Sequence, residues 1–146
     1  GHNMCTTFDQ FQRLLNGSIP AAPRIPVVAV DVRDVAEAHV KALTTPEAGG
    51  KRFPMGEATL YFGEIAKILR AAFPERARKI PSFDLPDWAV RLYAYFDSDV
   101  RSNLEELGVV KRLDSSDTVA LLGRPLIETR EAVTATGKSL IEQGLV

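Results

Sequence analysis

The hydrophobic pattern of residues 27–44 changes from that of a strand to that of a helix. A β-branched run with polar interruptions over residues 27–32 predicts a strand, and an alanine-rich stretch with apolar residues at helical spacing predicts a helix over about residues 35–44. Asp34 and Glu37 have the spacing of a capping box, in which side-chain oxygens accept hydrogen bonds from the free N–H groups of the first turn. Asp34 is therefore expected to cap this helix.

Helical spacing recurs through most of the chain. It predicts helices from Thr6 or Thr7 to Asn16, over about 61–73, over about 87–96, from Asp97 to Gly108, from Asp114 to Gly123 and over about 126–143. Short strands are expected only at 51–55 and 109–113, beside the strand of 27–32, and proline-marked loops at 18–26 and 78–86. So small a sheet cannot cover so many amphipathic helices. The pattern thus predicts a helix-rich α/β chain whose main parallel sheet lies in sequence upstream.

Composition and charge narrow the class. The 146 residues are 45% hydrophobic and 25% charged, which is typical of one globular domain spanning 1–146. A net charge of −1 without a basic run gives no basis for binding nucleic acid or an anionic membrane. Cys5 is the single cysteine, and His2 and His39 are far apart, so neither an internal disulfide nor a metal site is expected.

Targeting signals are also missing from the sequence. No apolar run approaches the ~20 residues that a membrane span needs, and no basic segment precedes an apolar core at the N-terminus. A cytoplasmic location is the resulting expectation. Residues 1–4 are read either as a tag remnant ahead of a start at Met4 or as the cut edge of a longer chain.

A series of short motifs carries a family resemblance. They are Leu14-Leu15-Asn16-Gly17, Val30-Asp31-Val32-Arg33-Asp34-Val35-Ala36-Glu37-Ala38-His39, Gly50-Lys51-Arg52-Phe53, Glu64-Ile65-Ala66, Leu121-Leu122-Gly123-Arg124-Pro125 and the closing Ser139–Val146. In this order they resemble the C-terminal, substrate-binding part of an extended short-chain dehydrogenase/reductase of the dihydroflavonol reductase-like, NAD-dependent epimerase group. The string from Val30 to His39 is the most specific of them.

The resemblance implies an oxidoreductase that binds NAD or NADP on a Rossmann sheet and moves a hydride to or from a carbonyl or alcohol carbon. Members of this family seat the cofactor on a glycine fingerprint and use a Tyr-x-x-x-Lys pair for acid–base chemistry. Neither is present, because Tyr61, Tyr93 and Tyr95 are followed four residues on by Ile65, Asp97 and Asp99. The chain alone is therefore expected to be inactive and to hold no cofactor, its catalytic residues lying in a missing N-terminal Rossmann half.

Three functions remain open at this point. The first is the substrate-binding portion of a reductase that acts on a ketone or aldehyde, the whole protein forming a homodimer as family members commonly do. The second is part of a nucleotide-sugar epimerase. The third is a stand-alone, non-catalytic α/β binding domain.

Five residues are candidates for the site by resemblance. Thr6 and Thr7 open a helix where family members approach the cofactor's phosphate and ribose, and a helix N-terminus favours anions. Pro26, Val27 and Val28 stand where related reductases line the substrate cleft, and two valines favour an apolar substrate. The plain alternatives are helix caps for the threonines and strand core for the other three.

Other conspicuous side chains are assigned to structure instead. Asp31, Arg33 and Asp34 are not taken as a catalytic cluster, because a cap and an ion pair account for them. His39 is expected to be a buried or half-buried packing residue. The aromatic side chains at 88, 93, 95 and 96 suit a lid over the substrate, but their helical spacing makes core packing the default expectation.

Overall fold

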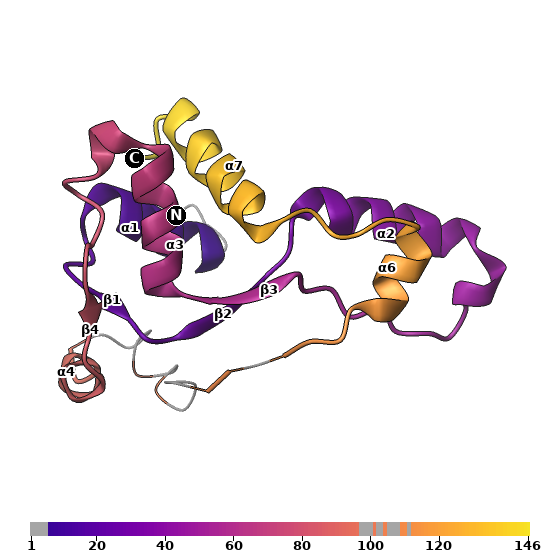
Figure 1. The fold of residues 1–146 in the computed structure, drawn as a ribbon, viewed down its shortest axis with the longest axis horizontal. Helices are drawn as coiled ribbons and strands as arrows, with labels where there is room; N and C mark the ends of the chain where they lie inside the picture. The colour runs from indigo at the N-terminus through magenta and orange to yellow at the C-terminus, as the bar shows by residue number, and fades with distance from the viewer. Residues whose placement is uncertain (1–5, 97–100, 102–103, 105–108, 111) are drawn as a thin grey trace. The chain divides into compact units, whose positions relative to one another are not determined.

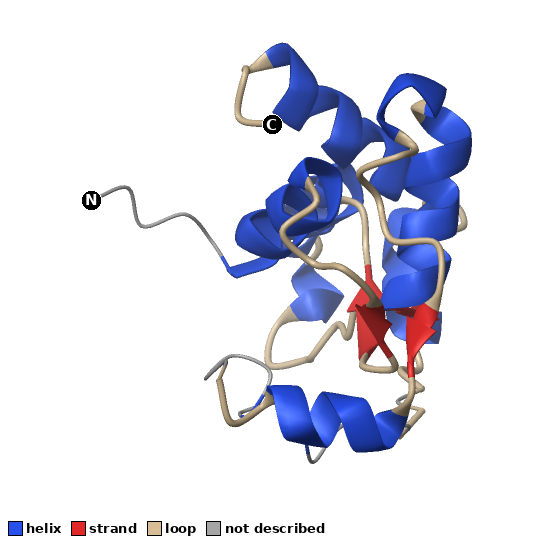
Figure 2. Cartoon of the chain, turned by 90° about the vertical axis from the view of Figure 1, so that its left-hand side faces the viewer, coloured by secondary structure: helices blue, strands red, loops and turns tan. Residues whose placement is uncertain are grey.

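The computed structural model describes residues 6–96, 101, 104, 109–110 and 112–146, apart from the side chains of Thr6, Thr7 and Tyr93. Within these residues the chain is helix-rich, with strands of only two to four residues (Figure 2). None of the described helices is both long enough and apolar enough to pass through a membrane. The expected helix-rich α/β character is confirmed.

The chain divides into two compact units. Unit 1 comprises residues 1–26, 61–109 and 133–146, and unit 2 comprises residues 27–60 and 110–132. The division falls inside the last helix, between Ala132 and Val133. This division into compact units does not test whether the chain is a single domain, which stays a prediction.

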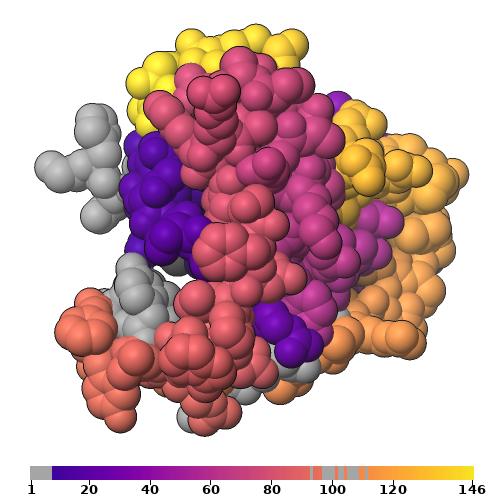
Figure 3. All heavy atoms as spheres, turned by 60° about the vertical axis from the view of Figure 1, so that its left-hand side comes forward, coloured from indigo at the N-terminus to yellow at the C-terminus, as the bar shows by residue number. Residues whose placement is uncertain are grey.

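Unit 1 is built around three helices. They are α1 (Thr6–Asn16), α3 (Phe62–Ala72) and the later part of α7 (Thr129–Glu142), and they lie near one another in Figure 1. Their buried apolar side chains form its core: Phe11, Leu14, Leu15, Phe62, Ile65, Leu69, Val133 and Leu140. Burial of this apolar surface supplies most of the stability of such a unit. Figure 3 shows one side of unit 1, with α1 in indigo beside the segment that follows α3.

Glycine lets α7 approach α3 closely. A methyl group at the buried Gly137 would lie 2.7 Å from Phe73 Cε2 and 2.9 Å from Leu69 Cδ2. These separations are shorter than carbon atoms tolerate, so a side chain here would push the two helices apart. Packing therefore explains a glycine inside a helix that its propensity disfavours.

Two short strands complete the described part of unit 1. β1 (Ala22–Pro23) pairs in parallel with β4 (Asp84–Leu85), with Ala22 opposite Asp84. A 3₁₀ turn, η2 (Pro74–Arg76), ends α3 where Pro74 blocks its continuation. Arg70 then holds the following loop, since its Nη1 donates to the carbonyl oxygens of Ala77 at 2.5 Å and Ile80 at 2.8 Å.

Unit 2 combines a small sheet with two packed helices. β2 (Pro26–Ala29) pairs with β3 (Ala58–Tyr61), and α2 (Val32–Thr44) packs against α6 (Ser116–Leu122), as Figure 1 shows. A 3₁₀ turn, η1 (Pro46–Ala48), follows α2. Gly123 ends α6 with a φ of 69°, the left-handed conformation that glycine adopts without strain.

The strand expected at residues 51–55 is wrong, because the strand forms at Ala58–Tyr61. In the earlier stretch, side chains satisfy the backbone in place of a neighbouring strand. Thr118 Oγ1 donates to Pro54 O at 2.5 Å, and Ser115 Oγ accepts from Gly56 N at 2.9 Å and donates to Gly56 O at 2.8 Å. The described residues of 109–113 also form no strand.

The helix expected at 87–96 exists as α4 (Asp87–Tyr93), but its buried side is not the aromatic one. Val90 and Ala94 are the buried residues, at 0% and 2% exposure. Trp88, Tyr95 and Phe96 are 70–84% exposed, so the expectation of core packing is wrong for these three. The side chain of Tyr93 and most of the helix expected from Asp97 to Gly108 lie outside the described part of the structure.

Candidate functional site

The amino end of α2 is capped by Asp31 and not by Asp34. Asp31 has the extended backbone of a cap residue, and its Oδ1 accepts a hydrogen bond from Arg33 N at 2.8 Å. The Arg33 side chain folds back onto the same carboxylate, with Nε 2.9 Å from Oδ1 and Nη2 2.8 Å from Oδ2. The expected cap at Asp34 is wrong, since α2 begins at Val32, one turn earlier than predicted.

Asp34 instead forms the buried centre of a charge cluster in unit 2. Its carboxylate is 0% exposed; Arg124 Nη1 lies 2.7 Å from Oδ1, and Ile127 N donates to Oδ2 at 2.8 Å. The contact with Arg124 is close but not aligned as a hydrogen bond, so Oδ1 has an ionic partner only. Burying a carboxylate is unfavourable unless it is paired, and Arg124 supplies that pairing.

Glu37 joins this cluster from the next turn of α2. Arg124 Nη2 lies 2.6 Å from Glu37 Oε2, and Lys41 Nζ lies 3.2 Å from Glu37 Oε1. The hydrogen bonds from Arg124, and then those from Lys41, lower the pKa of Glu37. The contact with Glu37, and then the contact with Asp34, raise the pKa of the Arg124 guanidinium. Sequence analysis gave Arg124 no role, because its partners lie near the other end of the sequence.

A second ion pair joins the start of α2 to α7 within unit 2. Arg33 Nη2 donates to Glu131 Oε1 at 2.8 Å as well as to Asp31. The Arg33 hydrogen bond is the main cause that lowers the pKa of Asp31. Nearby, Glu57 Oε2 accepts from Thr129 N at 2.9 Å and from Thr129 Oγ1, which caps α7.

Two carboxylates of these clusters, Asp31 and Glu37, have a lowered pKa. A general base or acid needs a pKa near the operating pH, whereas Asp31 and Glu37 are held as carboxylates by arginine partners. Asp31 and Arg33 have the cap and ion-pair contacts of structural residues, whereas Asp34 is not the cap that was expected, and the absence of a catalytic role for the three stays a prediction. No group of three or more metal-ligating side chains is found among the described residues.

His39 lies on the exposed side of α2, and the prediction of a packing histidine is wrong. Its Nδ1 is 2.7 Å from Val35 O, one turn back along the helix. The side chain thus rests on its own helix and is not held by the core.

The predicted substrate residues lie together on β2. Pro26 is buried, while Val27 and Val28 are half-buried. Val28 Cγ1 packs against Gly56, where an added methyl group would lie only 2.5 Å away. This packing accounts for Val28 as a strand residue.

The predicted cofactor residues stand at a helix start, as expected. α1 begins at Thr6, with Thr7 next in its first turn. Their side chains lie outside the described part of the structure. The helix is 11 residues long, and the N–H groups of its first turn have no acceptor within the helix, which is the arrangement that favours anions.

The contacts of Tyr61 are structural. It precedes α3, and its backbone N–H donates to Glu64 Oε2 at 2.8 Å. The Arg24 guanidinium stands 6.0 Å from its ring centroid, at the outer limit of a cation–π contact. Arg24 also lies 3.8 Å from Asp87. No lysine accompanies Tyr61 at the spacing that a reductase requires.

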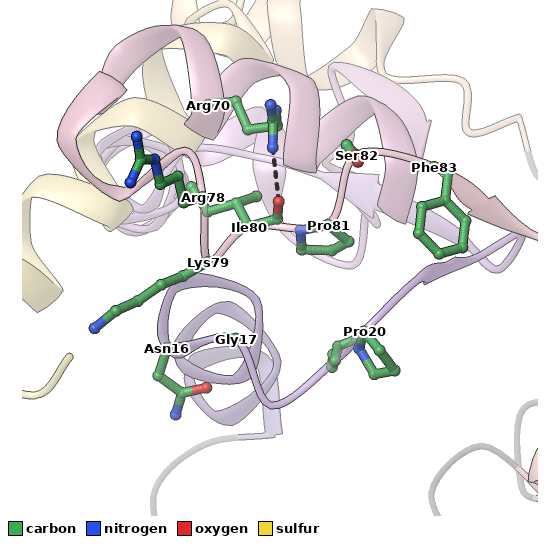
Figure 4. A pocket seen from close by; sticks show the side chains of 11 residues that line it. Asn16, Gly17, Pro20, Arg70, Arg78, Lys79, Ile80, Pro81, Ser82 and Phe83 are labelled. Atoms are coloured by element: carbon green, nitrogen blue, oxygen red, sulfur yellow. Dashed lines mark hydrogen bonds between the residues drawn. The ribbon is translucent and has the colours of Figure 1, made fainter.

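Unit 1 holds an open cavity of about 480 Å³ between the end of α1 and residues 78–83. In Figure 4, Asn16 and Lys79 stand at one end of it, and Pro20 and Phe83 stand at the other. Arg70 contributes to the lining, and its Nη1 donates hydrogen bonds to two backbone carbonyls. Of the predicted site residues whose side chains are described, Pro26, Val27 and Val28, none lines this cavity.

Comparison with known proteins identifies relatives among carbonyl reductases. The chain is 44% identical to the Aspergillus niger ketoreductase azaE over 72 residues, which are 49% of this chain and 21% of that protein. It is 27% identical to cinnamoyl-CoA reductase 1 of Arabidopsis thaliana over 132 residues, which are 90% of this chain and 33% of the relative. The chain thus spans about a fifth to a third of these relatives. No protein-family model matches it.

Solved structures share the fold. The yeast methylglyoxal/isovaleraldehyde reductase Gre2 complexed with NADPH superposes with a TM-score of 0.68 at 21% identity, covering 99% of this chain and 42% of that one. Gre2 of Candida albicans gives a TM-score of 0.68 at 23% identity over 99% of this chain and 39% of its own. Taken with the sequence matches, these findings show that the chain is similar to a portion of the extended short-chain dehydrogenases/reductases, among them the cinnamoyl-CoA reductases and the Gre2-like reductases.

Proposed function

We propose that this chain is the C-terminal, substrate-binding portion of an NAD(P)-dependent reductase of the dihydroflavonol reductase-like group. The complete enzyme transfers a hydride from the nicotinamide to the carbonyl carbon of a ketone or aldehyde. The observation that carries the proposal is the match to a ketoreductase and to cinnamoyl-CoA reductases over only a fifth to a third of their lengths. The other two thirds or more of each relative is long enough to contain a cofactor-binding part.

The division of labour follows from the residues. This chain contains no glycine fingerprint and no Tyr-x-x-x-Lys, so the proton donor and the main cofactor contacts belong to the other part of the enzyme. The chain supplies an apolar strand and a helix start. In the proposal, Thr6 and Thr7 bring hydroxyls and backbone N–H groups to the cofactor's phosphate and ribose. NADP is favoured over NAD, because relatives of the same fold were solved with NADPH.

Apolar residues on β2 set the proposed substrate class. Pro26, Val27 and Val28 form a wall without a hydrogen-bonding side chain. Such a wall binds the hydrocarbon part of a substrate by burial of apolar surface and offers nothing to a sugar or a nucleotide. This supports an apolar ketone or aldehyde over a nucleotide sugar.

Two polypeptides test the proposal. One is the 146-residue chain, and the other is the product of the complete gene, including any codons before residue 1. NADPH is titrated into each by following the fluorescence of Trp88, the single tryptophan of this chain. The complete product is expected to bind NADPH at micromolar concentration and to oxidise it with an aromatic or aliphatic aldehyde, whereas the short chain should do neither. Micromolar binding by the short chain, or a gene that starts at Met4, overturns the proposal.

A substitution on β2 tests the substrate wall separately. Val27→Ser in the complete enzyme should raise KM for an apolar aldehyde by about 5- to 150-fold and leave the affinity for NADPH unchanged, because one lost apolar contact is worth about 1–3 kcal/mol. Val119→Ser, a half-buried valine of α6, is the matched control. An unchanged KM for Val27→Ser removes β2 from the substrate site.

A further inference from the structure

Unit 1 contains a cavity that none of the proposed substrate residues lines. Its volume is about 480 Å³, which lies within the ~300–1,000 Å³ of small-molecule sites. One wall is the end of α1 with the loop after it, residues 16–20, and the other is the loop of residues 78–83. All of these residues belong to unit 1, so the cavity is formed within one compact unit.

Both walls of the cavity are held in place by contacts of their own. Arg70 Nη1 donates a hydrogen bond to Ile80 O at 2.8 Å, and the Ile80 side chain is only 2% exposed. The walls meet where the backbone of Gly17 lies against that of Lys79, since a methyl group added to Gly17 would lie 3.2 Å from Lys79 O. A ligand would therefore enter a cavity that already has its shape, and little binding energy would be lost in ordering the walls.

The described residues that line the cavity carry positive charge and no negative charge. Arg70, Arg78 and Lys79 are among them, and no aspartate or glutamate is. Arg78 and Lys79 are exposed, and neither forms an ion pair with a carboxylate in the described part of the chain. The cavity should therefore attract an anion, because no acid in its lining cancels this charge.

Asn16 adds a neutral hydrogen-bond donor to the cavity. Its Oδ1 accepts hydrogen bonds from Ser18 N at 2.9 Å and from Ser18 Oγ at 2.6 Å. Because a backbone N–H can only donate, these bonds identify the oxygen of the amide and leave its Nδ2 group as the donor for a ligand. Asn16 and Lys79 stand at the same end of the cavity in Figure 4. This end can thus bind a carboxylate or a phosphate through one charged and one neutral donor.

The opposite end of the cavity is apolar. Pro20 and Phe83 stand there in Figure 4, and the Phe83 side chain is 61% exposed. An exposed aromatic ring near a proline offers a flat apolar surface on which the ring of a ligand can stack. Polarity is therefore divided along the cavity, with donors at one end and apolar rings at the other.

From these observations we infer that the cavity of unit 1 binds a small aromatic anion. Its carboxylate or phosphate lies at Asn16 and Lys79, and its ring lies against Pro20 and Phe83. Arg78 adds to the attraction of the negative group. The inference does not rest on the proposed function, because it uses no residue assigned there to the substrate or the cofactor.

Four compounds separate the contributions of charge and ring. Phenylacetate and phenyl phosphate carry both, benzyl alcohol carries only the ring, and inorganic phosphate carries only the charge. Each is titrated into the 146-residue chain by isothermal titration calorimetry. The complete gene product is titrated in the same way, so the test holds whether or not the short chain folds alone. The two aromatic anions should bind with dissociation constants below about 1 mM, and the other two compounds at least about tenfold more weakly. The tighter of the two anions identifies the preferred negative group.

Two pairs of variants test which side chains make the contacts. Lys79→Gln and Phe83→Ala should each weaken the binding of phenyl phosphate about fivefold, because one removes the charged donor and the other the stacking ring. Lys67→Gln on α3 and Trp88→Ala on α4 are the matched controls, since both side chains are exposed in unit 1 and neither lines the cavity. The controls should leave the affinity unchanged. All four substituted side chains are exposed, so the melting temperature should change little in any variant.

Three results would overturn the inference. They are the absence of saturable binding of both aromatic anions at up to about 10 mM in both polypeptides, binding of benzyl alcohol or inorganic phosphate as tight as theirs, and equal losses for Lys79→Gln and Lys67→Gln. Equal losses would mean that the anions are attracted to the surface as a whole and not to the cavity. NADPH binding by the complete gene product is measured separately and decides the proposed function, whichever of these results is obtained.

Discussion

Arg124 Nη1 lies 2.7 Å from Oδ1 of Asp34, a carboxylate with no exposed surface. The two residues belong to chain stretches that are distant in sequence, on α2 and just after α6. The Arg124 guanidinium also holds Glu37, so one side chain neutralises two carboxylates of the same helix. The pair joins the two stretches of unit 2.

Removing Arg124 should destabilise the protein by leaving Asp34 buried without a counter-charge. Arg124→Met is expected to lower the free energy of unfolding by about 2–3 kcal/mol, below the full effect of a buried pair because Arg124 itself is 35% exposed. Urea denaturation gives the value. Arg91→Met, an exposed arginine of α4, should change it by less than about 0.5 kcal/mol.

The pairing itself can be separated from general damage at this position. In an Asp34→Asn background, Arg124→Met should cost less than about 1 kcal/mol, because no buried charge remains. Equal losses in the two backgrounds would show that Arg124 acts through packing alone.

The cap of α2 predicts different results for two substitutions at Asp31. Asp31→Ala removes the acceptor for Arg33 N and should lower the free energy of unfolding by about 1–2 kcal/mol. Asp31→Asn keeps an acceptor oxygen and should lose less than half as much. Thermal unfolding of the three proteins makes the comparison, and an asparagine variant as unstable as the alanine variant contradicts the assigned cap.

Stability should fall in acid because two carboxylates have a lowered pKa in the folded chain. Arginine partners hold the pKa of Asp31 below 3.8 and that of Glu37 below 4.5, which are their ordinary values. As the pH falls, the unfolded chain takes up these protons first, so this stabilisation is complete at neutral pH and is lost through the acidic range. The melting temperature, measured between about pH 7 and pH 2, should drop below about pH 4.5.

Glu37→Gln provides the matched test of that slope. Its melting temperature should be lower at neutral pH and fall less steeply with acid, because one of the two groups no longer titrates. If the slope is unchanged, the acid sensitivity comes from other carboxylates.

Close packing at Gly137 predicts that a helix-favouring substitution will destabilise the protein. Gly137→Ala gains about 1 kcal/mol of helix propensity but forces a methyl group against Phe73 and Leu69, at about 1–3 kcal/mol. We expect a net loss of about 1 kcal/mol, which Phe73→Leu should relieve. A melting temperature that rises for Gly137→Ala shows that propensity outweighs packing here.

Elements with local boundary signals were predicted well from the sequence. α1 ends at Asn16, before a Gly17 whose φ is 84°, and α6 ends at Gly123 in the same way. α3 ends where Pro74 follows. In each case the residue that stops the helix lies next to it, so short-range chemistry is sufficient.

Predictions that depended on distant partners were wrong. The spacing of Asp31 and Asp34 matches a capping box as well as that of Asp34 and Glu37 does, and only the position of Arg124 decides which aspartate is free to cap. On α4, periodicity identified an aromatic stripe, but Val90 and Ala94 are the residues that the fold buries. A helical pattern shows that a face exists and does not show what lies opposite.

The candidate site could be predicted only in outline. Residues of β2 and the start of α1 follow from the family resemblance, whereas the contacts of Glu57 with Thr129 and of Ser115 with Gly56 have no local signature. Both join residues that are far apart in sequence. Such pairs become visible only when the chain has folded.

The ion pairs of α2 also set an order of events during synthesis. Glu37 and its partner Arg124 are 87 residues apart, and at about 5–20 residues per second the ribosome needs roughly 4–17 s to make that stretch. During this interval Asp34 and Glu37 have no arginine partner, so unit 2 cannot complete its folding around them. A nascent chain released before residue 124 should leave α2 accessible to proteases and chaperones. The pairing of Arg124 with Asp34 and Glu37 is therefore a late step in the folding of unit 2.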